Sequence, residues 1–136
     1  MHAASQALIA AYYAAFNAGD MDTFLTLLTD DVIHDINQGA RETGKDAFQA
    51  FMKRMNLNYR ERLVDMTVMT SADGTRAAAE FVVLGEYLVT DEGLPPARGQ
   101  SYRLPAGAFF EIRDNKVARI TNYYNLEDWI RQVSGT

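Results

Sequence analysis

The sequence lacks cysteine altogether and contains only two histidines. Without cysteine the chain can form no disulfide, no thiolate metal site and no cysteine nucleophile. A protein zinc site takes three or four side-chain ligands, and the histidine other than His34, His2, lies in an expected N-terminal tail. We therefore expect no metal site.

Long apolar runs are also missing from the sequence. No stretch approaches the roughly 20 apolar residues that cross a bilayer as a helix. The start, Met-His-Ala-Ala-Ser, has neither the basic beginning nor the apolar centre of a signal peptide. These features predict a protein without a membrane partner, and we expect it in the cytoplasm.

The sequence has fewer basic than acidic residues. Thirteen Lys and Arg residues stand against eighteen Asp and Glu residues, which gives a net charge of −5. The basic residues are scattered rather than gathered into a stripe, so we expect no nucleic-acid partner. Apolar residues, in contrast, make up 48% of the 136 residues, which is enough for one folded domain over residues 1–136.

The first half of the sequence is typical of helices, because apolar residues recur there at helical spacing. We place three helices at residues 5–18, 20–31 and 43–58. Ser5, Asp20 and Thr43 are the expected N-caps, and the third cap is supported by Asp46, three residues further on.

From Arg60 the apolar residues alternate, which is typical of strands. We expect strands at residues 32–37, 61–70, 75–89, 100–112 and 116–124, and a short last helix at 126–133. Pro105 falls inside a strand and favours an edge position or a bulge there. Helices followed by a meandering antiparallel sheet indicate an α+β domain with the helices on one face. A long bent sheet over helices forms a cone with a pocket at its open end, and the 91–99 loop is expected to be a pocket lip or a partner contact.

Two adjacent ionisable residues, His34 and Asp35, interrupt the apolar strand at 32–37. Side chains alternate across a strand, so these two must lie on opposite faces. His34 shares its face with apolar neighbours and is interpreted as a structural histidine; acid–base chemistry and a dimer surface are the alternatives. For Asp35, catalysis or ligand contact and an ion pair with Arg41 or Arg60 both stay open.

Three motifs make the chain resemble a known family. They are the spacing from Tyr12 to Gly19-Asp20, Thr-Asp-Asp at 29–31 before a strand, and Gly-Lys-Asp-Ala-Phe at 44–48 opening a helix. Over essentially its whole length the chain resembles the nuclear-transport-factor-2-like superfold, and within it the ketosteroid-isomerase-related, SnoaL-like group. The resemblance implies a cone-shaped α+β barrel with N-terminal helices packed on a curved, mainly antiparallel sheet, and a homodimer formed through the outer sheet face. The superfold hosts isomerases, cyclases, dehydratases, epoxide hydrolases and non-catalytic binding subunits, so it does not fix the activity.

The resemblance also implies site residues. In ketosteroid isomerase an aspartate moves a proton while a tyrosine and a protonated aspartic acid hold the oxyanion. Tyr12 corresponds to that tyrosine, and Asp35 corresponds to the base if one residue is deleted in the strand; an ungapped comparison puts Ile36 there. Ala108 stands in place of the second acid and Met52 in place of a supporting tyrosine.

The family register predicts the wall of a ligand pocket. The residues expected to line it are Phe16, Phe81, Tyr102, Leu104, Ala106, Ala108, Phe110, Ile120, Asn122 and Tyr124. The alanines leave room for a small hydrophobic molecule with one carbonyl or hydroxyl group, although the same pattern also describes an ordinary core. Glu80 has the opposite parity to Phe81 and is expected on the outer face or in a dimer contact.

Three hypotheses for the function remain. In the first, the protein is an isomerase or lyase in which Asp35 takes a proton beside a carbonyl group and Tyr12 stabilises the enolate, with no metal or redox cofactor. In the second, a non-catalytic pocket protein binds a hydrophobic metabolite and uses the same two residues for orientation; the missing acid at Ala108 favours this one. In the third, the cavity is filled by its own side chains and the outer sheet face serves assembly alone.

Overall fold

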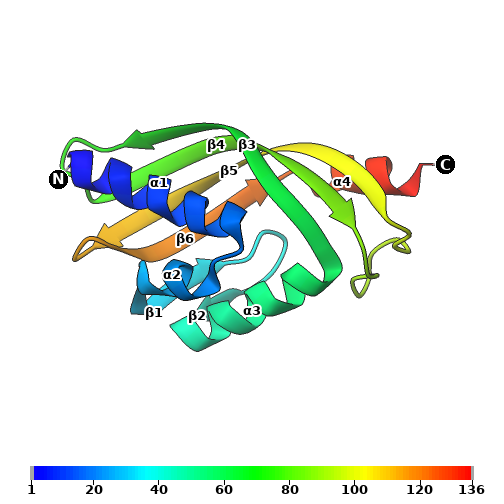
Figure 1. The fold of residues 1–136 in the computed structure, drawn as a ribbon, viewed down its shortest axis with the longest axis horizontal. Helices are drawn as coiled ribbons and strands as arrows, with labels where there is room; N and C mark the ends of the chain where they lie inside the picture. The colour runs from blue at the N-terminus through cyan, green and yellow to red at the C-terminus, as the bar shows by residue number, and fades with distance from the viewer. Residues whose placement is uncertain (1, 136) are drawn as a thin grey trace.

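The computed structural model describes residues 2–135, and within that range four helices and six strands are present (Figure 1). Their bounds are α1 (His2–Ala18), α2 (Met21–Thr26), β1 (Leu28–Asp35), β2 (Arg41–Thr43), α3 (Lys45–Asn58), β3 (Tyr59–Thr70), β4 (Arg76–Tyr87), β5 (Gln100–Arg113), β6 (Lys116–Tyr124) and α4 (Leu126–Ser134). None of these helices has the length and apolar character needed to cross a membrane.

The six strands form one curved sheet in the order β2-β1-β6-β5-β4-β3. Neighbouring strands are antiparallel except β1 and β6, which are parallel. Helices α1, α2 and α3 lie over the same face of the sheet (Figure 1). The predicted α+β class, with helices on one face of a mainly antiparallel sheet, is confirmed, and the sheet stays open rather than closing into a complete barrel.

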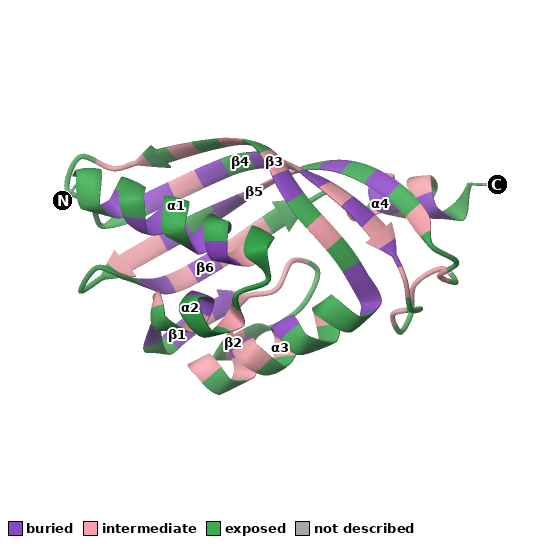
Figure 2. Ribbon diagram, viewed as in Figure 1, coloured by how far each residue is buried: buried purple, intermediate pink, exposed green. Residues whose placement is uncertain are grey.

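The core lies between these helices and the inner face of the sheet. In β4 every second residue from Ala77 to Tyr87 is buried (Figure 2), because the helices cover that face only. Asn17, near the end of α1, exchanges two hydrogen bonds of 3.0 and 2.9 Å with the backbone of Leu63 in β3. The end of α1 is therefore fixed to the sheet wall.

α1 begins before the residue that was expected to cap it. The helix already includes His2, and the hydroxyl of Ser5 donates to the carbonyl of Gly74 over 2.6 Å instead of capping. Asp20, in contrast, caps α2 as predicted, since its carboxylate accepts a hydrogen bond of 3.1 Å from the amide of Thr23.

The segment after β1 was expected to be a loop but contains the short strand β2. Thr43, the expected cap of α3, pairs there with Ile33, and Gly44 takes the N-cap position with a φ of +102° and no side-chain bond. α2 is also shorter than predicted: it ends at Thr26, because residues from Leu28 onward join the sheet.

β5 runs through Pro105 without a break. Strand β6 pairs with β5 only from Ala106 onward, so Pro105 has a strand neighbour on one side alone. The missing N–H of the proline therefore breaks no pairing with β6. The edge position predicted for Pro105 agrees with this arrangement.

Candidate functional site

A cavity of about 240 Å³ lies between the helices and the inner face of the sheet. Most of its wall is apolar, including Phe48, Phe51 and Met52 of α3. The polar and ionisable residues that line it include Tyr12, Tyr13, Asp20, His34, Asn37, Asn56, Tyr59, Glu61, Asn122 and Tyr124. Within residues 2–135, no lysine or arginine lines it. An apolar cavity with a few polar groups is the usual form of a small-molecule site.

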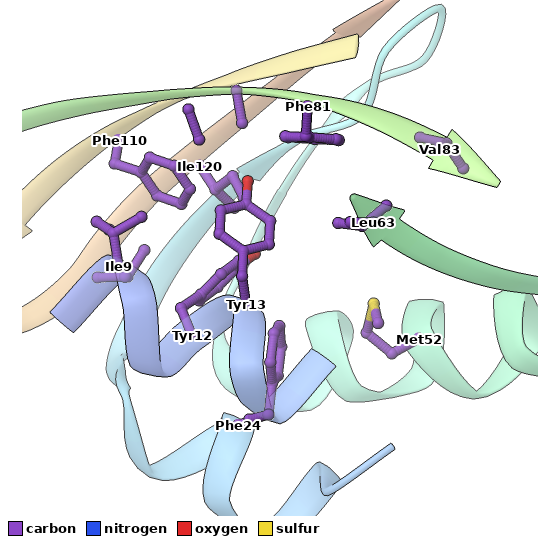
Figure 3. Close-up of a cluster of buried hydrophobic side chains, with 14 of the residues drawn as sticks. Ile9, Tyr12, Tyr13, Phe24, Met52, Leu63, Phe81, Val83, Phe110 and Ile120 are labelled. Atoms are coloured by element: carbon purple, nitrogen blue, oxygen red, sulfur yellow. The ribbon is translucent and has the colours of Figure 1, made fainter. Parts of the chain in front are cut away.

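Two adjacent tyrosines of α1 form one side of the cavity (Figure 3). The rings of Tyr12 and Tyr13 meet edge to face with centroids 4.9 Å apart, and Tyr12 also packs on Phe24 at 4.6 Å. Burial, and for Tyr12 the neighbouring Tyr13, raises the pKa of both hydroxyls, so both stay protonated. The hydroxyl of Tyr13 is buried without a hydrogen-bond partner among the described residues. This wall can therefore donate hydrogen bonds to a ligand oxygen.

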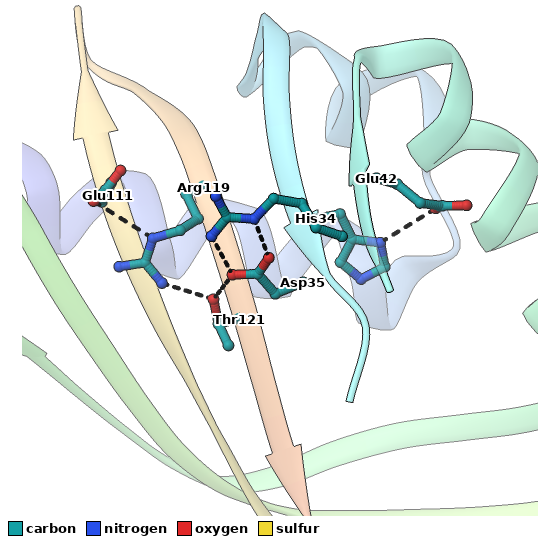
Figure 4. A network of polar contacts seen from close by, with 7 residues as sticks. His34, Asp35, Glu42, Glu111, Arg119 and Thr121 are labelled. Carbon is teal, nitrogen blue, oxygen red and sulfur yellow. Dashed lines mark hydrogen bonds and ion pairs between the residues drawn. The ribbon is translucent and has the colours of Figure 1, made fainter. Parts of the chain in front are cut away.

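His34 lies in the wall of the cavity, on the face of β1 that α3 covers. Its ring stacks on Phe48 with centroids 4.4 Å apart and meets the edge of Phe51 at 4.6 Å. Burial lowers the pKa of His34 to about 4 despite the opposing charge of Asp35, so the imidazole is neutral near pH 7. Its Nδ1 atom lies 3.9 Å from Oε1 of Glu42 on the paired strand (Figure 4). A neutral, buried imidazole can accept a proton.

Asp35 faces away from the cavity, which contradicts its expected place in the pocket. Arg41, opposite it on β2, donates to both carboxylate oxygens at 2.6 and 3.1 Å, and the hydroxyl of Thr121 donates at 2.6 Å (Figure 4). These bonds, Arg41 first, lower the pKa of Asp35 to about 2, whereas a cavity base would have a raised one. Ile36, the residue of the ungapped comparison, lines the cavity instead.

The structure places most of the other expected pocket residues in the cavity wall. Those that line it are Tyr12, Phe16, Phe81, Leu104, Ala106, Ile120, Asn122 and Tyr124. Three further expected residues, Tyr102, Ala108 and Phe110, are buried on the same sheet face but do not line the cavity. Phe110 instead packs beneath Tyr12, with centroids 5.3 Å apart. Glu80 is exposed on the opposite face, as its parity predicted.

Glu61 is a cavity residue that the sequence analysis missed. It lies on β3 between Tyr59 and Leu63, on the same sheet face, and the hydroxyl of Tyr102 donates to its Oε2 atom. Burial raises the pKa of Glu61 while the Tyr102 bond opposes the rise. The ring of Tyr102 crosses Gly85, where a Cβ would lie only 2.2 Å from its Cζ atom. The sequence gives one sign of this position: Glu61 has the same strand parity as Tyr59 and Leu63, which are both buried.

The 91–99 loop reaches the cavity through Leu94, which lines it. The loop is tied to the sheet by the hydroxyl of Tyr59, which donates to Asp91 over 2.9 Å, and by that of Tyr87, which donates to the carbonyl of Pro95 over 2.7 Å. The pocket-lip alternative for this loop therefore fits the structure.

Curved sheet, covering helices and an apolar cavity together define a small α+β protein built around a ligand-sized pocket. The model of the SnoaL-like domain matches residues 9–120, and the chain belongs to this family. The family resemblance seen in the sequence is thereby confirmed.

The chain is similar to solved structures along nearly its whole length. A candidate polyketide cyclase of Pseudomonas putida KT2440 is 67% identical, with a TM-score of 0.91 over 93% of this chain and 95% of that one. One from Xanthomonas campestris pv. campestris is 55% identical, with a TM-score of 0.94 over 97% and 98%. An NTF2-like protein of Burkholderia pseudomallei K96243, only 16% identical, shares the fold with a TM-score of 0.82 over 97% and 98%. No curated protein matches the sequence.

Proposed function

We propose that the protein is a cofactor-independent isomerase or lyase that moves a proton on a small, largely apolar carbonyl compound bound in the cavity. The observation that carries this proposal is the neutral imidazole of His34 in the cavity wall, beside the carboxylate of Glu42. His34 takes the role that the sequence had given to Asp35. The polyketide cyclase names of two similar proteins are compatible with carbonyl chemistry of this kind.

In the proposed reaction a nitrogen of His34 accepts a proton from the carbon next to the carbonyl group. The electron pair of the broken C–H bond forms an enolate, and the hydroxyl of Tyr12 or Tyr13 donates a hydrogen bond to its oxygen. The imidazolium then returns the proton to another carbon in an isomerisation, or to a leaving group in an elimination. The carboxylate of Glu42 stabilises the imidazolium and, with Nδ1–H directed to it, leaves Nε2 for the ligand.

The test is exchange of the protons next to the carbonyl group of 2-tetralone, a small apolar ketone, in deuterated buffer followed by NMR. Wild type is expected to accelerate the exchange, and His34→Gln to slow it at least about 100-fold, as for loss of a general base. Glu42→Gln, which acts through His34, is expected to lower kcat with little change in KM. Asp35→Asn is the matched control on the same strand and should retain the activity. Loss of exchange in Asp35→Asn, or full exchange in His34→Gln, would contradict the assignment.

A non-catalytic pocket protein is the second candidate. The observation that favours it is the position of Asp35, which is tied to Arg41 and Thr121 outside the cavity and so removes the base that the family resemblance implied. This candidate predicts that 2-tetralone binds in the cavity without any proton exchange.

We also propose that two copies of the chain pair through the outer sheet face. Phe109 and Tyr123 are both about half exposed there and meet edge to face with centroids 5.7 Å apart. Charges of both signs lie beside them, including Arg76 and Glu111, 3.4 Å apart. An apolar centre bordered by mixed charge suits a self-complementary twofold contact. The cytoplasmic location stays a prediction.

A further inference from the structure

One half-buried carboxyl in the cavity wall, that of Glu61, has no part in the proposed proton transfer. Among residues 2–135, two carboxyl groups line the cavity, those of Asp20 and Glu61. The first is exposed and occupied by capping α2. Glu61 is half-buried, and it needs an explanation because withdrawing a carboxyl from water is costly.

The position of Glu61 is fixed from two sides. Its neighbour Leu63 is bound through both backbone groups to Asn17 of α1. On the other side, the ring of Tyr102 passes over Gly85 and its hydroxyl donates to Oε2 of Glu61. One carboxyl oxygen is thus occupied by the protein, which leaves Oε1 with lone pairs for a ligand.

The surroundings of Glu61 determine what kind of group it can accept. No lysine or arginine lines the described cavity, so an anionic ligand would meet a carboxyl and no compensating positive charge. Tyr124, also in the wall, has its pKa raised by burial and by the charge of Glu61. A neutral group that donates a hydrogen bond fits these surroundings best.

Glu61 and the proposed base come from different strands of the cavity wall. His34 is on β1 and Glu61 on β3, and strands β6, β5 and β4 separate these two in the sheet. Both residues line the same cavity. A ligand in this cavity can therefore present one polar group to His34 and a second one to Glu61.

We propose that Glu61, held by Tyr102, is a second polar subsite that binds a hydroxyl group of the ligand. The substrate class is then a neutral, apolar compound with a carbonyl group and, separately, a phenol or alcohol group; carboxylates and phosphates are excluded. The subsite rests on the proposed function only in that the cavity takes a small apolar molecule.

Binding of matched naphthalenes tests the subsite without any turnover. The probes are 2-naphthol, which donates a hydrogen bond, 2-methoxynaphthalene, which does not, and 2-naphthoate, which is anionic; Kd is measured by calorimetry near pH 7. Wild type is expected to bind 2-naphthol about tenfold more tightly than the methyl ether, the size of one hydrogen bond to a charged group, and to bind 2-naphthoate more weakly than either.

The variants remove the acceptor. Glu61→Gln keeps the side-chain volume, but its single oxygen accepts from Tyr102 and its NH2 group can only donate, so the preference for 2-naphthol over the methyl ether should be lost. Glu61→Met should abolish the preference. Glu80→Gln, the same change on the exposed face of β4, is the matched control and should keep the tenfold ratio.

The outcomes separate the subsite from the proton transfer. A naphthol preference that depends on Glu61 supports the subsite even if His34→Gln has no effect on proton exchange. An unchanged ratio in folded Glu61→Gln and Glu61→Met overturns it, even if wild type catalyses exchange. Binding of 2-naphthoate as tight as that of 2-naphthol, or no binding of either neutral probe up to its solubility, also overturns it.

Discussion

Nδ1 of His34 and Oε1 of Glu42 face each other across 3.9 Å, and both atoms are buried without a hydrogen-bond partner among residues 2–135. An approach of about 1 Å would join them in a normal hydrogen bond. A donor and an acceptor poised in this way favour the tautomer with its proton on Nδ1. When the imidazole takes a second proton, the same contact becomes an ion pair, so the pair gains strength in step with the proposed proton transfer.

Replacing His34 should make the protein less sensitive to mild acid. In the folded state its pKa is about 4, lowered from 6.5 by burial, so below pH 6.5 the unfolded chain binds a proton that the folded chain does not. The neutral His34 imidazole therefore contributes its full stabilisation above pH 6.5, and this stabilisation is lost as the pH falls toward 4. Between pH 8 and pH 5, wild type should lose about 2 kcal/mol more unfolding free energy than His34→Gln. Urea unfolding at both pH values measures it, and equal losses would contradict the low pKa.

The strand that carries His34 and Asp35 separates what the sequence could predict from what it could not. Alternation correctly placed the two residues on opposite faces. Which face meets the cavity depended on where α3 packs and on β2, a strand of only three residues, Arg41–Thr43, in an expected loop. That strand brings Arg41 opposite Asp35, so the ion pair with Arg41, which the sequence analysis had left open as an alternative, is the one that forms.

The larger features of the fold were predictable because they depend on local patterns. The period changes from helical to alternating near Arg60, and the structure changes from α3 to β3 at Tyr59. The subsite at Glu61 was not predictable in the same way. It requires Gly85 and Tyr102 from two further strands in a single cross-strand row, and the register that aligns them is set by the whole sheet.

The ion pair between Asp35 and Arg41 should stabilise the fold without affecting the cavity. Its pKa of about 2 lies below the ordinary 3.8, so the ionised form is favoured by folding. That stability is present above about pH 4 and is lost as the pH falls toward 2. Asp35→Asn is expected to cost about 1 kcal/mol at pH 7, a modest value because the pair is partly exposed. The difference in unfolding free energy between the two proteins should shrink to about a third of its pH 7 value by pH 2.5; a constant difference from pH 7 to 2.5 would argue against the ionised pair.

Gly85 should be intolerant of even one methyl group. A Cβ there would lie 2.2 to 2.5 Å from ring and hydroxyl atoms of Tyr102, so Gly85→Ala is expected to cost about 1–3 kcal/mol through overpacking and to displace the Tyr102 hydroxyl from Glu61. In a Tyr102→Leu background, which removes the ring, the same change should cost less than about 0.5 kcal/mol. Urea unfolding of wild type, the two single variants and the double variant gives the coupling free energy between positions 85 and 102. Equal costs in both backgrounds would mean that the ring is not what excludes the methyl group.

Phe109→Glu should convert a dimer into a monomer. If two copies pair through the outer sheet face, the exposed ring of Phe109 lies in the contact, and two buried, unpaired carboxylates would replace the rings of both copies. Leu57→Glu, which changes an even more exposed side chain (70%) on α3, is the matched control and should leave the mass unchanged. Sedimentation equilibrium at micromolar concentration should give twice the chain mass for wild type and Leu57→Glu, and the single mass for Phe109→Glu. A monomeric wild type would refute the pairing, and a dimeric Phe109→Glu would move the contact away from this face.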